Sequence, residues 1–176
     1  MKTLYTGEDL LRLKQPGRWE VVRGELIELT PPGCEHGEIQ VNVASLLKGY
    51  AKQVGGRVLT ESGVYLERQP DTVRGPDVSF YSPGKLETVP TGFSCVVPDL
   101  VVEIISPGDS SQEVEGRLQE YLAAGVRRVW LLYPRTRTVY VHGQGRQVYR
   151  CDERDTLVDE EVLPGFSCRV AEFFDS

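Results

Sequence analysis

The alternation of apolar and polar residues predicts short strands interleaved with helices. The strongest strand signal lies at residues 100–105, where Leu-Val-Val-Glu-Ile-Ile is apolar except for Glu103. A second apolar run follows at residues 128–133, and residues 113–124 between them have the pattern of an amphipathic helix. A strand–helix–strand unit of this kind places its two strands parallel in one sheet. Shorter strand-like runs occur at residues 19–22, 26–29, 57–60, 64–66, 78–81, 138–142 and 147–151.

Two more helices are predicted in the first third of the chain. Thr6 followed by Asp9 is typical of a capped helix start, and Pro16-Gly17 ends this segment. Apolar residues then recur at helical spacing over residues 36–54. The order of the elements predicts an α/β or α+β fold, in which a mixed β-sheet is flanked by helices and preceded by an N-terminal helix and hairpin.

Composition indicates an ordinary globular protein. The chain has 176 residues, 40% hydrophobic and 26% charged, which fits a single domain over residues 1–176. No run approaches the roughly 20 apolar residues that cross a bilayer, and the start of the chain turns acidic where a signal peptide would be apolar. We therefore expect a cytoplasmic protein without membrane contact. The cysteines are scattered singly, which favours reduced, structural thiols, at Cys34, Cys95, Cys151 and Cys168.

Charge is distributed unevenly along the chain. The formal net charge is -6, which does not favour nucleic-acid binding. Residues 121–150, however, contain six arginines and no acidic residue, whereas residues 151–176 contain eight acidic residues and two arginines. The basic segment could form a phosphate-facing patch, or it could be a solvated hairpin with arginines on its outer face.

Two carboxylates stand out against this background. Glu103 interrupts the most apolar strand, where a charge is costly unless a basic side chain or a cation compensates it, although an outward-facing position on an edge strand would also accommodate it. Asp77 follows Pro76 at the entrance to another strand, where an aspartate alone is ordinary turn chemistry. Carboxylates on adjacent strand ends, together with a backbone carbonyl, form the oxygen-rich site that Mg²⁺ prefers.

The segments around these carboxylates resemble a known family. Pro76-Asp77-Val78 and residues 98–107 are similar to the two signature segments of the Uma-type restriction endonuclease family, within the PD-(D/E)XK nuclease superfamily. The similarity covers nearly the whole chain, including residues 23–26, 36–37, 118–126, 129–132 and 163–166.

This resemblance implies a restriction-endonuclease-like fold and a Mg²⁺- or Mn²⁺-dependent endonuclease that acts on DNA. Asp77, Glu103 and the backbone carbonyl of Ile104 would hold the metal. The superfamily expects a lysine two residues after the glutamate, but Ile105 occupies that position. In this family the lysine comes from the next helix, where the chain has Arg117.

Arg117 changes the expected chemistry, because arginine stays protonated and is a poor general base. It could contact phosphate, or it could only form a surface pair with Glu113 one helical turn earlier. Glu25 and His36 are weaker candidates: Glu25 could complete the acidic cluster or be solvated, and His36 could contact phosphate or cap its helix.

A second function is therefore compatible with the sequence, namely a catalytically silent nuclease fold that binds nucleic acid or protein. Ile105 and Arg117 in place of lysine favour it. The same carboxylates could also serve hydrolysis of another phosphate ester. A homodimer would suit cleavage of two strands, since each chain supplies one centre.

Overall fold

The computed structural model describes residues 3–175, so Met1, Lys2 and Ser176, which belong to the predicted domain of residues 1–176, lie outside the described residues. Its centre is a six-stranded mixed sheet in the order β10-β9-β8-β7-β6-β3. The two middle strands β7 and β8 are parallel and the other neighbours are antiparallel, which confirms the predicted parallel pair. The strands are β3 (Arg57–Thr60), β6 (Val78–Tyr81), β7 (Leu100–Ile104), β8 (Arg128–Tyr133), β9 (Thr138–Gly143) and β10 (Val148–Asp152).

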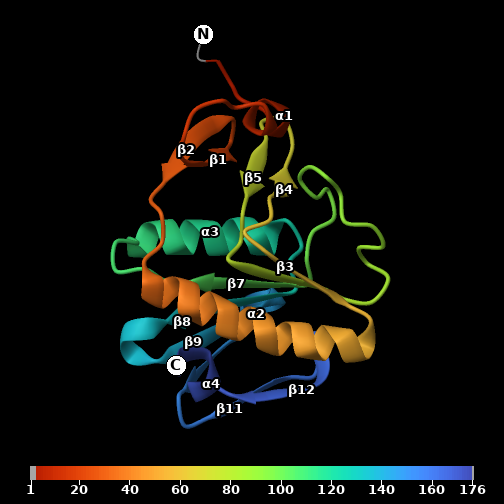
Figure 1. The fold of residues 1–176 in the computed structure, drawn as a ribbon, viewed down its shortest axis with the longest axis vertical. Coiled ribbons are helices and arrows are strands. Elements are labelled where there is room, and N and C mark those ends of the chain that lie inside the picture. The colour runs from red at the N-terminus through yellow and green to blue at the C-terminus, as the bar shows by residue number, and fades with distance from the viewer. Residues whose placement is uncertain (1–2, 176) are drawn as a thin grey trace.

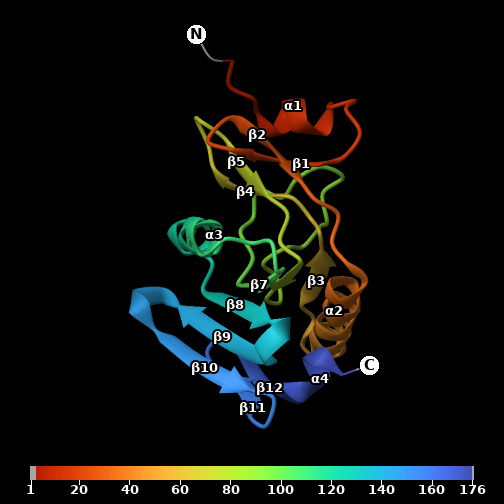
Figure 2. The same ribbon diagram turned by 90° about the vertical axis from the view of Figure 1, so that its left-hand side faces the viewer.

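Helices α2 (Cys34–Val54) and α3 (Ser111–Ala123) lie on opposite sides of this sheet (Figure 2). Successive side chains of a strand point to opposite faces. In β7, Val102 and Ile104 accordingly pack in the core under α2, whereas Val101 packs in the smaller core under α3. This alternation directs Glu103 toward α3.

A second, four-stranded sheet in the order β2-β1-β5-β4 lies with α1 at the N-terminal end of the molecule (Figure 1). The predicted hairpin is confirmed, and Arg23 and Gly24 form its turn with positive φ angles of 48° and 78°, as the favoured two-residue hairpin turn requires. The elements are α1 (Gly7–Leu11), β1 (Arg18–Val22), β2 (Glu25–Leu29), β4 (Val64–Glu67) and β5 (Thr72–Arg74).

Two expectations for this region need correction. The N-terminal helix begins as predicted, with a capping box between Thr6 and Asp9, but it ends at Leu11 and not near Pro16. Leu11 is 52% exposed, so no buried stripe extends the helix beyond its first turns. Strand β5 was not predicted, because three residues are too few to show an alternating pattern.

The C-terminal segment adds a hairpin and a short helix beneath the main sheet (Figure 1). Strands β11 (Thr156–Asp159) and β12 (Leu163–Arg169) pair antiparallel and α4 (Ala171–Phe174) follows. Phe166 and Phe173 are buried against Trp130 of β8, with ring centroids 6.0 and 5.9 Å away. The sequence did not predict this hairpin, because β12 contains Pro164-Gly165, a pair typical of turns. Short 3₁₀ turns η1 (Pro134–Thr136) and η2 (Gln144–Arg146) flank β9.

Two arginines of the basic segment, Arg128 and Arg137, are paired with acidic residues and do not contribute to the phosphate-facing patch considered above. Arg128 is buried and donates two hydrogen bonds to Asp159, at 2.7 and 3.2 Å. Arg137 pairs with Glu153 and Asp175. The acidic C-terminal segment therefore neutralises part of the basic segment.

All four cysteines are free, as the sequence predicted. Cys151 and Cys168 are buried in the main core, but Cys34 and Cys95 are exposed, so the expectation that every cysteine is structural is wrong for these two.

No helix among residues 3–175 is long and apolar enough to cross a membrane.

Candidate active site

Asp77 directly precedes β6 and connects this strand with β7 and α2. Its side chain is buried, and its Oδ2 atom accepts a hydrogen bond of 2.7 Å from the backbone N–H of Ile104 on β7. Its Oδ1 atom lies 3.0 Å from Nε2 of His36, in the first turn of α2. This hydrogen bond is the main cause that raises the pKa of His36, and burial opposes it. His36 therefore faces Asp77, and the cap position of α2 belongs to Gly33.

Glu103 projects from β7 toward α3 and is only 6% exposed. Its Oε1 atom accepts a hydrogen bond of 2.6 Å from the Tyr121 hydroxyl, and its Oε2 atom lies 3.7 Å from Nη1 of Arg117. Burial, and then the nearby charge of Asp77, raise the pKa of Glu103 to about 8. An outward-facing position for Glu103 is thus excluded: the carboxylate is buried beside a second one.

Arg117 lies at the site and not on the outer surface of α3. Its Nη2 atom lies 3.2 Å from Oδ1 of Asp109 in addition to the contact with Glu103. Burial opposes its charge, but Glu103 and Asp109 raise its pKa above the usual value, so it is a fixed cation. Glu113, the alternative partner, accepts instead from the hydroxyl and backbone N–H of Ser110 in the capping box of α3.

A third carboxylate, Glu20 of β1, was not predicted. It is buried, accepts 2.7 and 2.8 Å hydrogen bonds from Nη1 of Arg74 and the N–H of Gly75, and contributes to the raised pKa of Glu103. Nε of Arg74 also donates to Glu120 of α3 at 2.8 Å. The signal that could have found Glu20 is the one that found Glu103, a glutamate inside an apolar strand-like run.

Glu25, the predicted candidate from the same hairpin, occupies a different place. It is exposed at the start of β2, opposite Val22 and beside the turn. The hairpin thus brings Glu20 to the acidic cluster, where its contacts with Arg74 and Gly75 hold it beside the segment that leads to Asp77.

His36, Glu61 and Asp77 form a group whose ligand atoms all lie within 4.8 Å of one another. In the described part of the chain, it is the one group of at least three such side chains with this geometry. Gln40 of α2 supports it by donating to Oε1 of Glu61 at 3.1 Å and to the carbonyl of Asp77 at 2.8 Å. Arg18 of β1 forms an ion pair with Glu61. Sequence reasoning missed Glu61, which follows β3 in a loop without a strand pattern.

A cavity of about 520 Å³ opens beside these groups. His36 and Ile104 line it together with Ser106, Tyr133 and Arg135. The cavity therefore lies at the carboxyl end of the parallel strands, where open α/β sheets place their ligands.

This mixed sheet between two helices, with buried carboxylates at the ends of neighbouring strands, defines a nuclease-like α+β protein of the restriction-endonuclease type. The chain belongs to the Uma2 family, described as "Putative restriction endonuclease", whose family model matches residues 8–171.

A solved structure has the same fold over nearly the whole chain. The chain is similar to the crystal structure of "a putative nuclease belonging to DUF820" from Anabaena variabilis, with a TM-score of 0.80 and 22% identity over 96% of this chain and 97% of that one. A chain in a cryo-EM structure of a DrdV–DNA complex matches more weakly, with a TM-score of 0.40 and 21% identity over 76% and 77%. No curated protein matches the sequence. The similarity to the Anabaena protein confirms the predicted fold.

Proposed function

We propose that this protein is a metal-dependent endonuclease that hydrolyses phosphodiester bonds of DNA. The observation that carries the proposal is the pair of buried carboxylates, Asp77 directly before β6 and Glu103 on its antiparallel neighbour β7. Two buried carboxylates repel each other when both are charged. The cation that compensates Glu103 is Arg117, whose Nη1 atom lies 3.7 Å from Oε2 of Glu103. A bound divalent ion would relieve this repulsion, which is why such pairs are typical of functional sites.

The donor set fits a hard cation. The carboxylates of Asp77 and Glu103 and the carbonyl of Ile104 would supply the oxygen ligands that Mg²⁺ or Mn²⁺ prefers. When bound, the ion would neutralise developing charge on the phosphate and lower the pKa of an attacking water. The group of His36, Glu61 and Asp77 is a second candidate position that shares Asp77. Because imidazole suits metals such as Zn²⁺ whereas oxygen ligands suit Mg²⁺ and Mn²⁺, and because Arg18 already pairs with Glu61, we favour the position at Glu103 for Mg²⁺ or Mn²⁺.

Arg117 is suited to hold phosphate and not to remove a proton. Its guanidinium stays charged and faces the carboxylates, so it could stabilise a negatively charged transition state. No lysine pairs with Asp77 or Glu103 in the described residues: Lys85 pairs with Asp99 at 2.6 Å. A water activated by the metal would therefore have to attack without a neighbouring lysine as general base.

The test is cleavage of plasmid and single-stranded DNA with Mg²⁺ or Mn²⁺. Asp77→Asn and Glu103→Gln should each lose at least about 100-fold in rate, because even the loss of groups behind metal ligands costs roughly 10–100-fold. Glu38→Gln is the matched control, since Glu38 lies on α2 near His36 but is exposed. Retained cleavage in either site variant, with DNA cut by the control as well, would contradict the proposal. Loss of cleavage in Glu61→Gln, with cleavage retained in Glu103→Gln, would place the metal at the group of His36, Glu61 and Asp77 instead.

A silent nuclease fold that binds DNA is the second candidate, and Arg117 in place of the family's lysine favours it. Arg117→Lys distinguishes the two functions. If wild type does not cut and this variant does, the site is a nuclease centre whose chemistry has been switched off. DNA binding that persists in a chelator, without cleavage by either protein, would support the binding function.

A further inference from the structure

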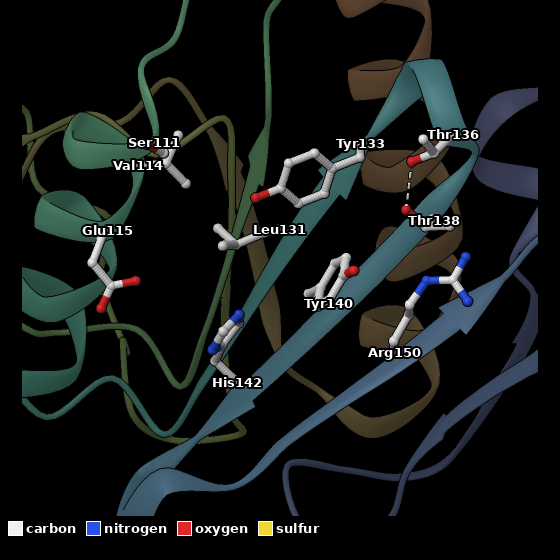
Figure 3. A pocket seen from close by; sticks show the side chains of 10 residues that line it. All are labelled: Ser111, Val114, Glu115, Leu131, Tyr133, Thr136, Thr138, Tyr140, His142 and Arg150. Atoms are coloured by element: carbon white, nitrogen blue, oxygen red, sulfur yellow. Dashed lines mark hydrogen bonds between the residues drawn. The ribbon is translucent and has the colours of Figure 1, made fainter.

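A second cavity lies on the α3 side of the sheet, where strands β8, β9 and β10 extend beyond the helix (Figure 3). It has a volume of about 530 Å³. Its floor consists of side chains from the three strands, with Tyr133 from β8, Tyr140 and His142 from β9 and Arg150 from β10, while Glu115 of α3 forms one wall (Figure 3).

The two faces of these strands differ sharply in chemistry. On the opposite face, Val139, Val141 and Cys151 are buried in the main core. On the cavity face, Tyr133 and Tyr140 are only partly buried and contact each other edge to face, with ring centroids 5.5 Å apart. Aromatic rings and an arginine that stay accessible on a sheet are the groups on which unpaired bases stack.

The cavity adjoins the one beside the candidate active site. Tyr133 and Thr136 line both this cavity and the one beside His36 and Ile104. A strand of nucleic acid with one phosphate at the carboxylates would pass Tyr133 to reach Tyr140. The distance along the sheet is short, because Tyr133 is the last residue of β8 and Tyr140 lies on the adjacent strand.

Charges at the cavity suit a nucleotide. The side chain of Arg150 is 50% exposed, and its nearest acidic partner, Asp152, is 3.9 Å away, so its guanidinium stays available for a phosphate. Arg135 lines the adjoining cavity. Burial lowers the pKa of His142, with Glu115 opposing, so its ring is a neutral partner for a base at neutral pH. The acidic lining side chain, Glu115, lies on the α3 wall, away from Arg150 (Figure 3).

We propose that this cavity is a nucleotide subsite, in which Tyr133 and Tyr140 contact one unstacked base next to the cleaved phosphate and Arg150 contacts its backbone. The inference rests on the proposed nuclease function and deepens it. An intact duplex cannot present an unstacked base, so the protein should prefer single-stranded or locally opened DNA.

The subsite is tested by the affinity for a labelled short oligothymidylate, measured by fluorescence anisotropy. Ca²⁺ replaces Mg²⁺ in this experiment so that the DNA is not cleaved. Tyr140→Ala should weaken binding by about five-fold or more, because stacking on one aromatic ring contributes roughly 1–3 kcal/mol per base. Tyr140→Phe keeps the ring and should bind like wild type. Arg150→Gln should weaken binding and reduce its salt dependence.

Tyr149→Ala is the matched control, since Tyr149 is the neighbour of Arg150 on β10, 40% exposed, and its hydroxyl donates to Val158 on β11. It should leave affinity unchanged. An oligonucleotide with abasic sites should bind wild type as weakly as the intact oligonucleotide binds Tyr140→Ala. Thermal unfolding of each variant verifies that the fold is kept.

The outcomes separate this inference from the proposed function. Equal affinity of wild type and Tyr140→Ala, or of the intact and abasic probes, would overturn the subsite even if the protein cuts DNA. Stacking-dependent binding in a protein that never cuts would support the subsite and contradict the nuclease. If wild type does not bind the probe and forms a dimer that Tyr140→Ala dissociates, the face belongs to a second copy of the chain and the subsite is wrong.

Discussion

The behaviour of the site depends most on the single residue Glu103. Its carboxyl group is held by Tyr121 and lies near Arg117, yet burial and Asp77 raise its pKa to about 8 from an ordinary value of 4.5. Between these two values the unfolded chain releases a proton that the folded protein retains. The stability that this group contributes is therefore present below about pH 4.5 and is lost as the pH rises through about 8.

Glu103→Gln removes this titration. The variant and wild type should have similar free energies of unfolding at about pH 5, whereas at about pH 9 the variant should be more stable by roughly 1–3 kcal/mol, because it carries no buried charge beside Asp77. Urea unfolding at both pH values in the presence of a chelator measures the difference. If the free energies of unfolding of the two proteins change with pH in the same way, the pKa of Glu103 is not raised and the prediction is wrong. Addition of Mg²⁺ should stabilise wild type at high pH and not the variant.

At the scale of elements, helix α3 determines where two of the site groups lie. Arg117 and Tyr121 are one turn apart on its buried side, and the capping box between Ser110 and Glu113 fixes the start of the helix. The sequence predicted this helix over residues 113–124, and the structure begins it two residues earlier, at Ser111. Sequence left open which side of α3 carries Arg117, since spacing equally allowed a pair with Glu113.

Ser110→Ala should destabilise the protein by about 0.5–2 kcal/mol, because it leaves the N–H of Glu113 without its cap. Ser111→Ala, one residue later and without a part in the cap, is the control and should be nearly neutral. Denaturant unfolding measures both variants. If they lose equal stability, the capping box does not hold the helix start.

At the scale of the whole molecule, the acidic C-terminal segment attaches to the sheet through Arg128. Its side chain is 5% exposed and that of Asp159 is 2% exposed, and the two form a bidentate pair. A second carboxylate, the exposed one of Glu161, also accepts a hydrogen bond from Arg128 at 2.8 Å. This pairing joins β8 to the β11–β12 hairpin, which covers the core beneath Trp130.

Asp159→Ala should cost about 3–5 kcal/mol, because it leaves a buried guanidinium without its partner. Glu161→Ala removes a carboxylate that is 55% exposed and should cost about 1 kcal/mol or less. Thermal unfolding of the two variants gives the comparison. Similar losses in both would mean that the buried pair does not anchor the hairpin.

The sequence by itself determined the fold class, the parallel β7–β8 pair, helices α2 and α3 and the importance of Glu103. These features depend on local periodicity and on the cost of a charge in an apolar run, which neighbouring residues alone reveal. Only the tertiary structure decided that Glu20 lies near Glu103 and Glu61 near Asp77, that Glu25 is exposed beside the hairpin turn, that Arg117 faces Glu103, and that the acidic tail pairs with Arg128 and Arg137. Each of these depends on contacts between residues far apart in the chain, whose partners are set by packing and hydrogen bonding across elements and leave no periodic pattern in the sequence.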